Sequence, residues 1–306
     1  MMSLVSDYLD LRRAAGFKLR ATGSRLRSFA RAAEERSEIH IRTETATAWA
    51  GTASSPYERH NRLRDLIIFA RHLRAEDTAH ELPDIEFFPF RYHRRPPHIF
   101  SEEEEAHILA AAGRLGPPGT SRADTYRTLL ATLMATGLRV GEALRLKIEN
   151  LTADGLFVRD TKFSKSRLVP LHPTTAAALG DYRAQWRVVV EPDAPFFVSS
   201  KGEALAYSTV YDTFRGILRC LDLSPGATAG RGRPRPCLQD MRHTFAVRAL
   251  EACPDARAAI NRHMLALSTY MGHCSVASTY WYLHATPRLM TDIADACEAW
   301  CTGGDR

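Results

Sequence analysis

The sequence predicts a mainly α-helical fold with a small β-sheet, divided between two domains. The chain has 306 residues, a length that fits two domains better than one. Apolar residues recur at helical spacing through residues 3–74. Pro96 and Pro97 then mark a stiff linker, because proline cannot continue a helix. We therefore expect a helical domain at residues 1–90, a linker at 91–98 and an α+β domain at 99–306.

The first domain is predicted to consist of four short helices. The first ends near Gly16, and the next two carry apolar stripes at about residues 26–33 and 45–50. The fourth begins after Ser55, whose side chain can cap the helix. Glu58 lies three residues later, so the pair predicts a capping box.

Basic residues are more concentrated in the first part of the chain than in the rest. Residues 1–97 carry 17 Lys+Arg against 13 Asp+Glu, whereas residues 98–306 carry 24 against 22. With a net charge of +6, this distribution favours a polyanionic partner. Arg59, Arg62 and Arg71 are expected to contact the phosphates of double-stranded DNA, which positions a protein without reading sequence. Solvated helix faces in an arginine-rich proteome are the alternative interpretation.

Several classes of protein are not favoured by the composition. No apolar run approaches the ~18 residues that span a membrane, and no signal-peptide pattern is present, so we expect a cytoplasmic, nucleoid-associated protein. The six cysteines form no CxxC pair, which makes a disulfide framework or a zinc site an unfavoured interpretation. Cys297 and Cys301 lie one helical turn apart, but no histidine pair accompanies them.

The α+β domain is predicted to begin with three helical segments. Ser101 opens the first with an acidic capping box. The second covers residues 126–136 and ends at Gly137. In the short third segment Glu142 follows Arg139 by three residues, so the two side chains can pair on one helix face.

A β-hairpin and further helices are expected to complete this domain. Residues 156–158 and 168–171 have strand character, and the turn between them holds Lys162 and Lys165. The remaining helices are predicted at about residues 174–189, at 207–221, from 238 onward, and at 257–269.

One stretch near the end of the chain organises the others. Gly272 is expected to end a helix, His273 follows it, and Tyr282 comes nine residues later on a short helix. Arg139 and Arg242 each lie in an ordered setting elsewhere in the domain. An arginine fork matches phosphate oxygens, and a tyrosine hydroxyl can attack phosphorus to form a covalent intermediate.

Four short motifs occur in order along the second domain. They are ATGLRVGE at 135–142, TKFSKSRLVPL at 161–171, MRHTFA at 241–246, and MGH at 271–273 followed by Tyr282. Any one alone would be weak, but together they resemble the motifs of the tyrosine recombinases, the phage integrase family. The resemblance implies that residues 1–90 are a core-binding domain that grips DNA and that residues 99–306 are the catalytic domain.

The resemblance also implies a site-specific DNA recombinase that works through a 3′-phosphotyrosyl intermediate. Tyr282 would attack the scissile phosphate, and Arg139, Arg242 and His273 would stabilise the charge on its oxygens. The phosphodiester energy stays in the covalent link, so no metal and no ATP cofactor is expected. The alternative is a structural role for either arginine, such as a simple ion pair of Arg139 with Glu142.

Several positions leave alternatives open. Lys162 lies in the usual place of the general acid that protonates the leaving 5′-oxygen, but hairpin register leaves Lys165 as a competitor, or as a DNA contact. Gln239 stands three residues before Arg242, where the family usually has histidine. An amide donates a hydrogen bond but carries no proton near neutral pH, so weakened activity is expected. Arg233 is either a phosphate contact or part of a solvated loop.

The tail at residues 289–300 follows the predicted nucleophile. Leu289, Ile293, Cys297 and Trp300 share one face of the helix expected there, and an apolar stripe needs a cover. By resemblance the tail would dock on a neighbouring protomer in a homo- or hetero-tetramer on paired sites. A monomeric type IB topoisomerase and a weakened DNA-binding accessory protein are the alternative functions.

Overall fold

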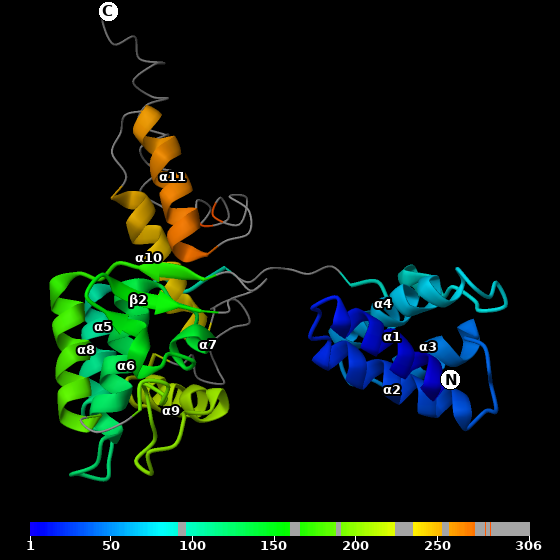
Figure 1. The fold of residues 1–306 in the computed structure, drawn as a ribbon, viewed down its shortest axis with the longest axis horizontal. Helices are drawn as coiled ribbons and strands as arrows, with labels where there is room; N and C mark the ends of the chain where they lie inside the picture. Colours follow the sequence, from blue (N-terminus) through cyan, green and yellow to red (C-terminus); the bar gives the residue numbers. More distant parts are fainter. Residues whose placement is uncertain are drawn as a thin grey trace, which may run out of the picture. The chain divides into compact units, whose positions relative to one another are not determined.

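The computed structural model of the chain describes residues 1–90, 96–159, 166–187, 191–223, 235–252 and 257–272, together with Thr279 and Tyr282. The chain divides into two compact units, Met1–Arg94 and Arg95–Arg306. Both units are built mainly of helices, and the second also holds a small antiparallel sheet, so the predicted fold class is confirmed (Figure 1). No helix among these described residues is long and apolar enough to cross a bilayer.

The first unit contains the four predicted helices around one apolar core (Figure 1). They are α1 (Met2–Ala14), α2 (Arg20–Glu34), α3 (Thr43–Gly51) and α4 (Pro56–Leu73), followed by the short 3₁₀ helix η1 (Ile85–Phe87). Phe29 and Phe69 are fully buried, and the Phe29 ring meets the edge of Trp49 at 5.3 Å between centroids. The apolar stripes in the sequence therefore face inward, as helical spacing requires.

The start of α4 corrects one prediction. Ser55 does cap the helix, because its Oγ accepts the backbone N–H of Glu58 at 3.2 Å. The capping box is incomplete, since the Glu58 carboxylate accepts instead from Arg25 Nε at 2.8 Å and Nη2 at 2.9 Å. Arg25 also donates to Asp65 at 2.9 Å and so ties α2 to α4. A bidentate charged pair is stronger than a neutral backbone cap, which explains why Glu58 turns away from Ser55.

The second unit is centred on α6, which contacts α5, α8 and α10. Its helices are α5 (Glu102–Ala112), α6 (Arg122–Thr136), α7 (Val140–Ala143), α8 (Pro173–Trp186), α9 (Tyr207–Cys220), α10 (Leu238–Glu251) and α11 (Arg257–Met271). The capping box predicted at Ser101 is confirmed with Glu104, which completes both of its hydrogen bonds. Leu129, Leu130 and Leu133 of α6 are buried in the main core.

A three-stranded antiparallel sheet contains the predicted hairpin. The 3₁₀ helix η2 (Ile148–Asn150) leads into β1 (Leu151–Thr152), β2 (Gly155–Val158) and β3 (Arg167–Val169), which lie in the order β1-β2-β3. In the hairpin Leu156 pairs with Val169 and Val158 with Arg167, so the two predicted strands are confirmed. The strand β1 was not predicted, because two residues are too few to show a pattern. In Figure 1 the sheet lies at the end of the helical bundle from which α11 extends, and β3 contacts α11.

Candidate active site

The turn between α6 and α7 positions Arg139. Gly137 ends α6 with φ of +58°, and a Cβ added there would lie 2.5 Å from the Phe245 ring, so both the backbone and the space require glycine. Arg139 precedes the first turn of α7. Glu142 accepts the Arg139 backbone N–H at 3.1 Å and its Nη1 at 2.8 Å, which confirms the predicted pairing.

Arg242 lies on α10 and is almost fully buried, with 2% of its surface exposed. Its Nη1 donates to the carbonyl of Gly137 at 2.6 Å, and its Nη2 donates to the carbonyl of Met271 at 2.5 Å. The pKa of Arg242 is lowered to about 10. Burial is the main cause, and the positive charge of Arg139 is the second. The guanidinium stays charged at neutral pH and is fixed in direction by these two carbonyls.

The carboxyl end of α11 brings the two predicted arginines together. The helix ends at Met271, and Gly272 follows with φ of +65°, as the sequence predicted. Arg242 binds the carbonyl of Met271, and Arg139 Nη2 reaches the carbonyl of Gly272 at 3.4 Å. Residues that are more than a hundred positions apart in the sequence therefore meet at this turn.

Tyr282 lies beside this cluster, with 4% of its surface exposed. Its ring is 5.3 Å from the ring of His243, and it belongs to a small apolar cluster with Val247 and Met271. An ionised Tyr282 would act to raise the pKa of Arg242, so the two side chains lie within electrostatic range of each other. The predicted nucleophile and the predicted phosphate-binding arginine are thus neighbours.

The structure adds two residues to the predicted site. Arg167, the first residue of β3, donates to Glu142 through Nη2 at 2.8 Å and Nη1 at 3.3 Å, and to the carbonyl of Tyr270 through Nε at 2.8 Å. Glu142 therefore joins Arg139 and Arg167, and only 3% of its surface is exposed. Burial acts to raise the pKa of Glu142, but Arg167 and then Arg139 outweigh it and bring the pKa to about 2.

Four predicted site residues and the predicted tail fall outside the described residues. They are Lys162, Lys165, Arg233 and His273, together with the tail at 289–300. Both lysines belong to the segment between β2 and β3. Val158 and Arg167, which pair with each other, lie on either side of this segment. The assignments of these residues stay predictions.

The other predicted residues are described and differ in their surroundings. Gln239 is exposed on the first turn of α10, three residues before the buried Arg242. In the first unit, Arg59 donates to the carbonyl of Ala53 at 2.7 Å, and Arg62 donates to the carbonyl of Trp49 at 3.1 Å and to Thr52 at 2.8 Å. Arg71 is exposed near the end of α4. Arg59 and Arg62 therefore use some of their N–H donors to stabilise the first unit.

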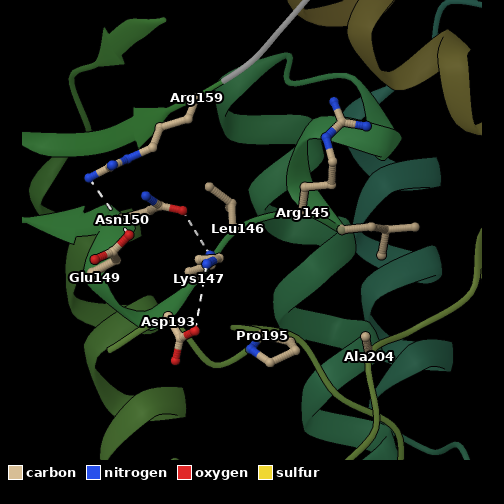
Figure 2. A pocket seen from close by; sticks show the side chains of 10 residues that line it. Arg145, Leu146, Lys147, Glu149, Asn150, Arg159, Asp193, Pro195 and Ala204 are labelled. Carbon is tan, nitrogen blue, oxygen red and sulfur yellow. Dashed lines mark hydrogen bonds and ion pairs between the residues drawn. The ribbon is translucent and has the colours of Figure 1, made fainter. Parts of the chain in front are cut away.

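A separate pocket of about 450 Å³ lies next to the sheet and contains none of the predicted site residues (Figure 2). It holds three cations, Arg145, Lys147 and Arg159. Arg159 pairs with Glu149 at 3.7 Å, and Lys147 with Asp193 at 3.9 Å. Two of the three cations are thus offset by carboxylates inside the pocket, which leaves an excess of one positive charge there, against two in the arginine cluster at α11.

Comparison with known proteins shows the family to which the chain belongs. The family described as "Phage integrase family" matches residues 99–288. The protein y4rB of Sinorhizobium fredii (strain NBRC 101917 / NGR234), which carries the name of an integrase/recombinase, is 38% identical over 94% of each chain. The tyrosine recombinase XerC of Methylobacterium sp. (strain 4-46) is 31% identical over 75% of this chain and 68% of its own. A lambda integrase tetramer bound to a Holliday junction has a similar fold, with a TM-score of 0.60 at 18% identity, covering 89% of this chain and 77% of that one.

The family match and the recombinase relatives place the chain in the tyrosine recombinase class, enzymes that break and rejoin DNA strands at specific sites. The chain belongs to the phage integrase family. It is therefore a site-specific DNA recombinase, and the resemblance of its four motifs to those of the tyrosine recombinases is confirmed.

Proposed function

We propose that this recombinase cleaves DNA through Tyr282, with Arg139 and Arg242 holding the scissile phosphate. The observation that carries the proposal is the convergence of both arginines on the carboxyl end of α11, beside Tyr282. Arginine forks bind phosphate oxygens in a fixed geometry, and donors that are already oriented stabilise charge as it develops. The ion pairs that the buried Glu142 carboxylate makes with Arg139 and Arg167 hold the cluster in place before DNA arrives.

The proposed reaction forms and breaks one bond at phosphorus. The Tyr282 phenol gives up its proton to solvent water as its oxygen attacks the phosphate, and the bond to the 5′-oxygen breaks, which leaves a 3′-phosphotyrosyl link and a free 5′-hydroxyl. Arg139, Arg242 and His273 stabilise the non-bridging oxygens, and Lys162 gives the leaving oxygen its proton. A nicked suicide substrate tests the proposal, because the cleaved strand diffuses away and the covalent protein–DNA adduct accumulates on a denaturing gel.

The first unit would grip the DNA duplex through its arginines, and action on chromosomal DNA would place the protein on the nucleoid. Arg71 is exposed, whereas Arg59 and Arg62 hold backbone carbonyls of their own unit. We infer that Arg71 serves DNA alone and that the other two combine both roles. All three contacts are to phosphate and should weaken with added salt.

Substitutions at Gln239 test the one catalytic position at which this chain departs from the usual histidine of the family. Gln239→Ala should slow single-turnover cleavage, because one oriented donor near the phosphate is lost, an effect of ~10²-fold in other enzymes. Gln239→His should keep activity and introduce a pH dependence near the imidazole pKa of ~6.5. The measurement is the cleavage rate from pH 5.5 to 9 for the parent and both variants. An alanine variant as fast as the parent at every pH would remove Gln239 from the site.

The tail at 289–300 would join protomers into a tetramer on paired sites. A chain that stops after Pro287 should bind a single DNA site almost as well as the full chain, because the tail is proposed to touch protein rather than DNA. Synapsis of two sites and formation of recombinant product should fall sharply. Gel-shift assays on one site and on paired sites separate the two effects. Recombination at the full rate without the tail would show that protomers assemble by other surfaces.

A further inference from the structure

The carboxyl end of α11 is held by three arginines from three different elements. The last carbonyls of a helix have no partner within it and need donors from elsewhere. Here the successive carbonyls of residues 270–272 each accept from a different guanidinium. The donors are, in order, Arg167 Nε at 2.8 Å, Arg242 Nη2 at 2.5 Å and Arg139 Nη2 at 3.4 Å. Two of these arginines are proposed to bind phosphate, and the third, Arg167, has no assigned role.

The guanidinium of Arg167 packs closely against the turn at Gly272. A Cβ added to Gly272 would lie 2.8 Å from Arg167 Nη1 and 3.0 Å from its Cζ, so the guanidinium fills the space beside the turn. Gly272 also has a positive φ. The turn that leads toward His273 is therefore shaped by Arg167 on one side and by a backbone conformation that favours glycine.

The remaining donors of Arg167 bind Glu142. Nη2 meets Oε2 at 2.8 Å and Nη1 meets Oε1 at 3.3 Å, while Glu142 Oε1 also accepts Arg139 Nη1 at 2.8 Å. Arg139 thus shares its carboxylate with a second cation. In an interior of low dielectric, a carboxylate that faced Arg139 alone would offset most of the positive charge that Arg139 presents to a phosphate.

The net charge of the cluster supports a different role for Arg167 than for Arg139 and Arg242. Arg139, Arg167 and Arg242 carry three positive charges, and Glu142 carries one negative charge. The excess of two positive charges matches the two negative charges that a phosphodiester carries when it becomes a pentavalent phosphorane. If Arg167 were absent, Glu142 would remain buried and the excess would fall to one.

We propose that Arg167 is a positioning residue for the recombination reaction: it offsets the charge of Glu142 and holds the end of α11, so that Arg139 keeps its charge and direction for the phosphate. The inference rests on the proposed function of Arg139 and Arg242. Arg167 uses three of its five N–H donors within the protein, one on each nitrogen, and only 11% of its side chain is exposed, which favours action through Arg139 and the turn over direct contact with DNA.

Single-turnover cleavage of the nicked suicide substrate tests this role. Arg167→Ala should slow cleavage by on the order of 10²-fold, in the range found for lost orienting groups in other sites. Arg167→Lys should recover part of the rate, because a lysine supplies the charge but cannot bind both Glu142 oxygens and a carbonyl as a fork does. Binding to one DNA site should stay within about twofold, because Arg167 does not contact DNA.

Arg248 provides a matched control. It also combines a carboxylate, Glu105 at 2.6 Å, with a backbone carbonyl, Phe100 at 2.9 Å, in the same unit. Arg248→Ala therefore removes the same kinds of contact away from the cluster, and its cleavage rate should stay near that of the parent. Circular dichroism and thermal unfolding of both variants measure the structural cost of each change.

Two readouts separate the charge role from a merely structural one. Adding Glu142→Gln to Arg167→Ala should bring cleavage back to within about tenfold of the parent, because the uncompensated carboxylate is gone. In Arg167→Ala alone, the pKa of Glu142 should rise from its value of about 2, since Arg167 is the main cause of that low value. The rate deficit relative to the parent should then shrink as the pH falls toward this raised pKa, because a protonated Glu142 no longer offsets the charge of Arg139.

The outcomes are distinguishable. A parent protein that forms no adduct would overturn the proposed function itself. A parent that forms adduct, with Arg167→Ala equally fast, would overturn the positioning role and leave the function standing. A double variant as slow as Arg167→Ala, together with a deficit that does not change with pH, would show that Arg167 only supports the fold. If the alanine variant does not fold, Arg167→Gln with and without Glu142→Gln carries the same comparison, because glutamine removes the positive charge and keeps more of the side-chain volume.

Discussion

Tyr282→Phe should abolish the covalent protein–DNA adduct while DNA binding is kept. The substitution removes only the hydroxyl that we propose attacks phosphorus, and the ring can still fill its buried place beside His243 and Met271. Without a nucleophile the cleavage rate should fall below detection. The measurement is adduct formation on the nicked suicide substrate, with a gel-shift assay on the same DNA to confirm binding.

Tyr280→Phe is the control for this prediction, because Tyr280 lies two positions away on the same predicted helix. It should form adduct at close to the parent rate. A dead Tyr280→Phe protein beside an active Tyr282→Phe protein would mean that the last motif has been placed in the wrong register.

Arg242→Ala should have the next largest effect, about 10³-fold or more on the single-turnover cleavage rate. The variant loses a fixed cation beside the developing charge, and such donors are among the largest contributions to catalysis. It should also lower stability, by roughly 1–3 kcal/mol for each of the two buried carbonyls that loses its donor. Cleavage kinetics and thermal unfolding measure the two effects separately.

Arg242→Lys separates charge from geometry at this position. A lysine keeps a positive charge but cannot reach the carbonyls of both Gly137 and Met271 as the guanidinium does. We expect it to be more active than the alanine variant and far less active than the parent. An Arg242→Lys protein with the full cleavage rate would mean that the two carbonyl contacts do not matter for the reaction.

Local features of the fold were well predicted because their causes lie within a few residues. The helix that begins at Ser101 depends on a serine and a glutamate three positions apart. The end of α6 depends on Gly137, whose positive φ a glycine adopts without strain. The hairpin from 156 to 169 depends on two apolar runs with a polar segment between them. In each case spacing and residue type were sufficient.

Contacts between distant segments were not accessible to the same reasoning. Arg167 was visible in the TKFSKSRLVPL motif, but its partner Glu142 lies 25 residues earlier and the carbonyl of Tyr270 lies 103 residues later. Similarly, the capping box at Ser55 was only half right because Arg25, 33 residues away, binds Glu58. Periodicity assigns a side chain to a face of an element and cannot say which distant charge meets it there.

The arginine contacts at the end of α11 also affect when the protein can become active during its synthesis. Arg242 reaches back to the carbonyl of Gly137, and both Arg139 and Arg242 need the carbonyls of residues 271–272. A nascent chain that has emerged only as far as the β-hairpin lacks α10, α11 and Tyr282, although its first unit can already fold, since domains fold as units during translation. An unfinished chain would therefore lack Tyr282 and the rest of the proposed cleavage site, so we expect only a chain translated past Tyr282 to cut DNA.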